Sequence, residues 1–156
     1  MPISLTLPKW YDLHTHMRQG DMLRPMIAEH LKMGCAGILA MPNTKPPIAK
    51  VLKNDAGADW SIEAYLEDLR AAGGDAFTDI IVPLYLTPNT TPKMIADGAK
   101  TGLLRAVKYY PPHGTTGAGH ARPLDFYRKN GVLKRLKATP LSAVEFLAAQ
   151  IGSRPM

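Results

Sequence analysis

The chain has 156 residues, of which 46% are hydrophobic and 21% are charged. This length and balance predict one soluble globular domain and argue against an intrinsically disordered chain, which has few apolar residues and a high net charge. No apolar run is long enough to span a bilayer, and the first ten residues lack the basic start and apolar stretch of a secretory signal, so we expect a cytoplasmic protein with no membrane contact.

The formal net charge of +6 favours an anionic partner. Positive residues are scattered along the chain, however, and only Tyr127 to Lys137 is locally basic. This segment lacks interleaved aromatic residues that would stack on bases, so a solvated helix face explains it better than a nucleic-acid site. We therefore expect no nucleic-acid partner. The lone Cys35 is expected to be a small core residue.

Apolar segments alternate with segments of helical period, a pattern typical of repeated βα units and a parallel sheet. In chain order, we predict strands within residues 4–16, 36–44, 77–87 and 103–111. The helices between them are predicted within residues 20–34, 61–74 and 91–102. Ser61 is expected to cap the second helix, and the third has a proline in its first turn.

A loop rich in Gly, Pro and Thr follows, from Pro111 to Pro123. Loops of this length in compact domains tend to be functional lids or disordered segments. We predict a further helix within residues 124–136 and an amphipathic stretch within residues 141–152.

Two histidines, His14 and His16, lie one residue apart at the end of the first predicted strand. Side chains alternate along a strand, so both imidazoles point to the same side and can reach one metal ion, and Arg18 continues that parity. Taken alone, the pair fits a metal site and two ordinary histidines about equally well. Its place at the carboxyl end of a parallel strand favours a functional site, because ligands gather there in α/β folds.

Two further motifs stand at predicted strand ends, MPNTKPP from Met41 to Pro47 and KYYPPHGTT from Lys108 to Thr116. Together with DLHTHMRQGDML, they resemble the dihydroorotases, enzymes of the amidohydrolase superfamily. The resemblance runs from the start of the chain to about Tyr127. It implies a zinc-dependent cyclic amide hydrolase that interconverts dihydroorotate and N-carbamoyl-aspartate, its small-molecule substrates, in de novo pyrimidine biosynthesis.

The resemblance also implies a centre with two zinc ions. His14 and His16 would bind one ion, and Lys108 would carry a carboxylate that bridges both and takes part in catalysis. The lysine must lose its proton before it is carboxylated, and partial burial among cations favours that loss.

Four more residues match substrate-binding positions of the family. Arg18 and Asn43 match those that hold the substrate carboxylate, for which a guanidinium fork is well suited. Thr115 and Thr116 match a loop that closes over the substrate.

Each assignment has an ordinary alternative. Lys108 also reads as a surface lysine at a strand end, Asn43 as a turn residue after proline, and the Gly-rich loop as a flexible linker. His30, on the apolar face of the first predicted helix, is expected to be a core histidine with satisfied hydrogen bonds.

The implied fold is α/β, an incomplete (β/α)8 TIM-type barrel with about the first four βα units and a divergent helical tail. Such barrels have eight strands and typically about 250 residues. We assign residues 1–130 to the N-terminal portion of a dihydroorotase-like barrel and residues 131–156 to the tail. The family's other metal ligands and its general base have no counterpart here. Two functions stay open, a dihydroorotase-like enzyme and a truncated, inactive remnant that acts as a binding or interaction module. The sequence is also compatible with a homo-oligomer.

Overall fold

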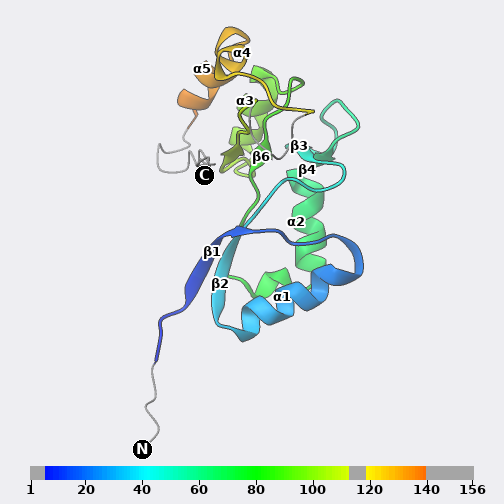
Figure 1. The fold of residues 1–156 in the computed structure, drawn as a ribbon, viewed down its shortest axis with the longest axis vertical. Coiled ribbons are helices and arrows are strands. Elements are labelled where there is room, and N and C mark those ends of the chain that lie inside the picture. The colour runs from blue at the N-terminus through cyan, green and yellow to red at the C-terminus, as the bar shows by residue number, and fades with distance from the viewer. Residues whose placement is uncertain (1–5, 113–118, 140–156) are drawn as a thin grey trace, which may run out of the picture.

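The computed structural model describes residues 6–112 and 119–139, and Figure 1 shows their arrangement. The strands, in chain order, are β1 Trp10–Thr15, β2 Cys35–Ala40, β3 Ile48–Lys50, β4 Trp60–Ser61, β5 Asp79–Ile81, β6 Leu84–Tyr85 and β7 Val107–Lys108. The helices are α1 Leu23–Lys32, α2 Ile62–Ala71, α3 Pro92–Lys100, α4 Leu124–Lys129 and α5 Val132–Lys137, with short 3-10 helices at Gly20–Met22 and Gly74–Ala76.

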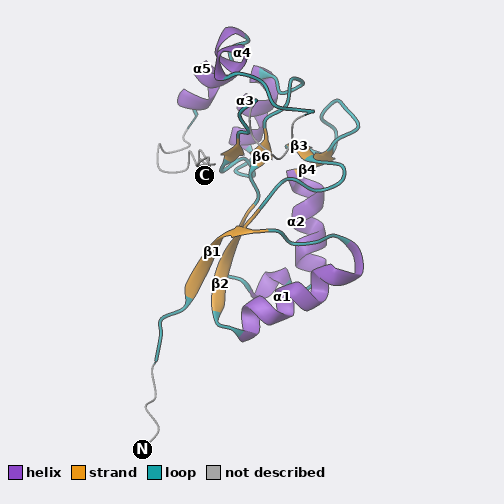
Figure 2. Ribbon diagram, in the orientation of Figure 1, coloured by secondary structure: helices purple, strands orange, loops and turns teal. Residues whose placement is uncertain are grey.

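The strands form three small sheets, and every strand pair in them is parallel. The largest sheet has the order β1-β2-β5, while β3 pairs with β4 and β6 pairs with β7. Figure 2 shows α1 and α2 beside β1 and β2, and α3, α4 and α5 at the opposite end of the molecule. The predicted α/β class with parallel pairing is therefore confirmed.

The helix starts follow from local sequence signals. Ser61 precedes α2, and its hydroxyl accepts a hydrogen bond from the Ala64 amide at 3.1 Å. Thr91 caps α3 in the same way through the Met94 amide, and Pro92 occupies the first turn, where a missing N–H costs nothing. The predicted cap of the second helix is confirmed.

Beside a small cluster of Leu39, Met41 and Ala106, the described residues form a main hydrophobic core that joins the helices to the strands. Its fully buried members come from both ends of the chain, and they include Ile27, Ile48, Ile62, Leu69, Leu84, Ile95, Tyr127 and Val132. Cys35 is 4% exposed within this core, which confirms its predicted place.

The structure corrects three predicted elements. The predicted strand at 77–87 is divided, because Pro83 has no amide proton to donate, and its halves β5 and β6 join different sheets. The fourth predicted strand is regular only at Val107–Lys108. The predicted helix at 124–136 breaks into α4 and α5 at Gly131, whose φ of +81° is a conformation that glycine adopts without strain. The small β3–β4 pair was not predicted.

A bidentate ion pair between Arg105 and Asp79 holds the start of β5. Arg105 donates to both carboxylate oxygens of Asp79, with Nη1–Oδ1 at 2.5 Å and Nη2–Oδ2 at 2.8 Å. The hydrogen bonds from Arg105 hold the pKa of Asp79 below its ordinary value. A carboxyl group with a lowered folded-state pKa adds stability above its unfolded pKa, and this stability is lost as the pH falls through the folded-state value.

We expect Asp79→Asn to remove this part of the acid sensitivity. Both side chains are more than a third exposed, so the effect at pH 7 should stay below about 1 kcal/mol. Urea unfolding at pH 7 and at pH 3 measures it, with Asp21→Asn on the exposed 3-10 turn as the control. The prediction fails if both variants lose the same stability between the two pH values.

Candidate functional site

The two histidines of the first strand end lie side by side. His14 is in β1 and His16 follows it, and their ring centroids are 5.4 Å apart with the planes inclined by 55°. Two imidazoles on one tetrahedral zinc ion, each with a Zn–N distance of about 2.0–2.1 Å, have ring centres roughly 5 Å apart. The observed spacing therefore suits two ligands of one ion.

Lys108 is the last residue of β7 and is 3% exposed. His14 and Lys108 line the same small cavity, together with Leu13, Leu39, Met41, Pro83, Ala106 and Val107. The Lys108 Nζ lies 3.3 Å from the Met41 Sδ and 5.2 Å from the centre of the Tyr110 ring. These neighbours offer no carboxylate, and burial lowers the pKa of Lys108.

The pKa values of the two histidines are shifted in the direction that favours metal binding. Burial lowers the pKa of His14, and the charge of Lys108 lowers it further against an opposing effect of Asp12. Burial also lowers the pKa of His16, with added contributions from His14, Arg18 and Lys108. Both imidazoles thus favour the neutral form, which is the form that binds metals.

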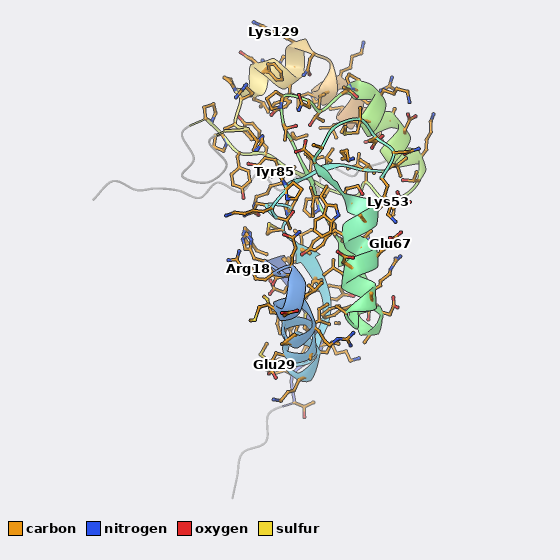
Figure 3. The ribbon with its side chains drawn as sticks, turned by 90° about the vertical axis from the view of Figure 1, so that its right-hand side faces the viewer. Arg18, Glu29, Lys53, Glu67, Tyr85 and Lys129 are labelled. Atoms are coloured by element: carbon orange, nitrogen blue, oxygen red, sulfur yellow. The ribbon has the colours of Figure 1, made fainter. Side chains whose placement is uncertain are left out.

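The loops after β1 and β2 bring the next two predicted residues to the same end of the sheet. Arg18 is exposed, and Figure 3 shows its side chain at the surface. Asn43 is partly buried, and its Oδ1 atom is buried without a hydrogen-bond partner among the described residues. The Gln19 Oε1 accepts a hydrogen bond from the Lys45 amide at 3.2 Å, which ties the two loops together.

His30 has satisfied hydrogen bonds, as the sequence predicts, but it is partly buried and lies at the margin of the core, not within it. Its Nδ1 lies 2.8 Å from the Met26 carbonyl oxygen, and its Nε2 lies 3.2 Å from the Asp12 Oδ2. Thr115 and Thr116 fall outside the described residues, so their predicted role stays a prediction.

Sequence reasoning missed the aromatic side chains beside Lys108. Tyr110 packs on Tyr85 with ring centroids 5.1 Å apart, and His120 meets the edge of Tyr85 at 5.8 Å. The signal was present, because Tyr110 lies two residues after Lys108 and shares its strand parity. Tyr85 gave no such signal, since its contact depends on the pairing of β6 with β7.

Within residues 6–112 and 119–139, no group of three or more His, Cys, Asp or Glu side chains is placed to hold a metal ion. The donors at the candidate site in this part of the chain are therefore the two imidazoles and the Lys108 amine. Among the same residues, no helix has the length and apolar character needed to cross a membrane.

Comparison with curated proteins finds relatives that cover most of this chain. A probable dihydroorotase from Schizosaccharomyces pombe is 37% identical over 116 residues, which are 74% of this chain and 31% of that protein. The dihydroorotase of Agrobacterium fabrum is 35% identical over 133 residues, or 85% of this chain and 36% of that enzyme. That of Rhizobium leguminosarum bv. trifolii is 36% identical over 140 residues, or 88% and 37%. No protein-family model matches the chain.

Solved structures give the same result. The crystal structure of dihydroorotase in complex with 5-fluoroorotic acid from Saccharomyces cerevisiae matches with a TM-score of 0.68 and 26% identity, over 84% of this chain and 34% of that one. A dihydroorotase from Campylobacter jejuni shares the fold with a TM-score of 0.61 at 22% identity, over 85% of this chain and 35% of that one. Over most of its own length, and about a third of theirs, the chain is similar to dihydroorotases.

Proposed function

We propose that this chain provides the zinc-binding and carboxylate-binding part of a dihydroorotase-like cyclic amide hydrolase. The substrates are dihydroorotate and N-carbamoyl-aspartate, which the reaction interconverts in pyrimidine biosynthesis. The observation that carries the proposal is the convergence of His14 and Lys108, from strands far apart in the sequence, on one cavity, with His16 beside His14.

The donor set fits the first part of a two-zinc centre. His14 and His16 would hold one ion, and a carboxylate formed on Lys108 would bridge it to a second. The low-polarity surroundings of Lys108 favour its neutral amine, which is the form that reacts with carbon dioxide. When bound, the ions would polarise the ring amide carbonyl of the substrate.

Arg18 and Asn43 would hold the substrate carboxylate beside this centre. A guanidinium donates two parallel hydrogen bonds to a carboxylate, and the Arg18 side chain is exposed. Asn43 would donate to the same carboxylate through its Nδ2 amide group, whereas its Oδ1, which is buried without a partner among the described residues, is an acceptor and would take a hydrogen bond from a donor group. Thr115 and Thr116 belong to the same proposal as the loop that closes over the substrate.

The fold assignment is part of the proposal. Residues 1–130 would form the first four βα units of an incomplete (β/α)8 barrel, which agrees with the parallel pairing of every described strand pair. Residues 131–156 would be a divergent tail, of which Val132–Lys137 is helical. We also place the protein in the cytoplasm, which is compatible with the buried free thiol of Cys35.

A second function is favoured by the ligand count. A catalytic zinc ordinarily has three protein ligands and a water, whereas the described residues contain no suitable group of three acidic, histidine or cysteine side chains. By itself, the chain would then be an inactive remnant that binds metal or an anionic ligand without turnover.

Carboxylation of Lys108 gives a direct test. In the presence of zinc and ¹³C-bicarbonate, we expect one carbamate carbon signal in the NMR spectrum of the protein. Lys108→Ala should abolish this signal, while Lys100→Ala, at an exposed position on α3, should retain it. A signal that survives in Lys108→Ala, or its absence from the unmodified chain, would contradict the assignment.

A further inference from the structure

Tyr65 is a buried tyrosine of α2 whose hydroxyl reaches the loop after β1. The hydroxyl donates to the Met17 carbonyl oxygen at 2.7 Å, and the exposed fractions of the two residues are 0% and 2%. Met17 stands between His16 and Arg18 in the sequence. The hydrogen bond therefore fixes the carbonyl of the residue between His16, a proposed zinc ligand, and Arg18, a proposed substrate ligand.

The same tyrosine also contacts the residue that holds the second loop. The Trp60 ring packs on Tyr65 with centroids 5.1 Å apart, and the Trp60 amide donates to the Pro47 carbonyl oxygen at 2.9 Å. Pro47 ends the MPNTKPP motif, which contains Asn43. The start of α2 thus contacts both loops that carry the candidate residues.

We propose that Tyr65 is a positioning residue that fixes His16 and Arg18 relative to His14. The inference rests on the proposed function, because it assigns zinc to the histidines and the substrate carboxylate to Arg18. A binding constellation must be held to within about 0.5 Å by its supporting residues, and a buried hydrogen bond to the intervening carbonyl provides such support. Without it, the Met17 carbonyl is unsatisfied or turns toward water and rotates the adjoining peptides.

The chemistry of the group suits this role. Burial raises the pKa of Tyr65 well above its ordinary value, so the hydroxyl stays protonated and donates throughout the physiological range. Tyr65→Phe removes the donor and keeps the ring that packs on Trp60. The variant therefore isolates the hydrogen bond from the packing.

Tyr127→Phe is a matched control. Tyr127 is also 0% exposed, and its hydroxyl donates to a backbone carbonyl, that of Leu86, at 3.2 Å. The bond joins α4 to the residue after β6 and touches neither His16 nor Arg18. Both variants lose one buried tyrosine–carbonyl bond, and only Tyr65→Phe loses it between His16 and Arg18, because the Leu86 side of the control bond is paired with Lys108 instead.

The first measurement uses the metal-free chain. The ring centroids of His14 and His16 are 5.4 Å apart, so protons of the two rings should give a nuclear Overhauser effect. We expect Tyr65→Phe to weaken this effect strongly and Tyr127→Phe to preserve it. An unchanged effect in Tyr65→Phe, or an equal loss in both variants, would overturn the positioning role. This readout needs no zinc, so it decides the inference even if the zinc assignment proves wrong.

The second measurement is zinc affinity by competition with a chelating dye. We expect Tyr65→Phe to weaken binding about tenfold, the lower end of the effect of removing groups that orient metal ligands. Ser61→Ala removes the N-cap of the same helix and leaves the Tyr65 hydroxyl in place, so it should change the affinity less than twofold. An equal loss of zinc affinity in Ser61→Ala would assign the effect to the stability of α2 and refute the inference. If the unmodified chain has no zinc affinity, that result counts against the proposed function alone.

Discussion

The purified 156-residue chain is expected to bind zinc weakly and to show no dihydroorotate hydrolysis above the metal-free background. The described part of the site offers His14, His16 and Lys108, and His30 is engaged by Asp12 and by the Met26 carbonyl. Loss of a general base alone typically forfeits about 10² to 10⁴ in rate. Loss of most ligands of a second ion should forfeit that ion as well.

An ultraviolet assay of dihydroorotate at saturating zinc measures the rate, and His16→Ala provides the background of a chain with one candidate ligand removed. The expectation is contradicted if turnover rises in proportion to the protein concentration and is lost in His16→Ala. In that case, chelation should also abolish the turnover of the unmodified chain, and added zinc should restore it. Such turnover would require that further ligands come from a second subunit.

Gly37→Ala is expected to lower the free energy of unfolding by about 2 kcal/mol. Gly37 lies in the central strand β2, where an added Cβ would be 2.8 Å from the Asp79 carbonyl oxygen and 2.4 Å from the Tyr11 ring. The half-exposed Tyr11 ring can turn aside, but the Asp79 carbonyl cannot move without disturbing the pairing of β2 with β5. Overpacking costs typically 1–3 kcal/mol or more, which outweighs the gain of about 0.5–1 kcal/mol from replacing glycine in a strand.

Urea unfolding measures this loss, and Gly119→Ala is the control because a Cβ at Gly119 meets no atom of the described residues within 4 Å. The control should stay within about 0.5 kcal/mol of the unmodified chain, as most surface substitutions do. Equal stability of the two variants would show that the sheet adapts at Gly37.

The features that the sequence predicts well are local ones. Ser61 caps α2 through an amide three residues away, and the alternation of side chains in β1 is enough to suggest that His14 and His16 share one side. Lys108 was found by its motif, since a lysine at a strand end has by itself no distinctive signal. Its burial is a property of the folded chain, set by Met41 and the other residues of the cavity.

The features that escaped prediction depend on which strands become neighbours. Pro83 divides an apolar run that reads as one strand, and the two parts then pair with β2 and β7. The bond from Tyr65 to the Met17 carbonyl joins residues far apart in the sequence, and no periodicity reports it. Tertiary pairing therefore decides the supporting contacts of the site, while local pattern indicates its ligands.

Every strand pair among the described residues is parallel, so none can form from a tight hairpin. Gly37, for example, meets Asp79 only after the intervening chain, α2 included, has closed a long loop. Loop-closure entropy precedes the gain from such distant contacts, which makes parallel sheets slow to fold. During that time the apolar strand β2 lacks its partners and can aggregate. A chain with only parallel strand pairs among its described residues therefore depends on dilution or chaperones to avoid aggregation more than a hairpin-rich domain of equal stability does.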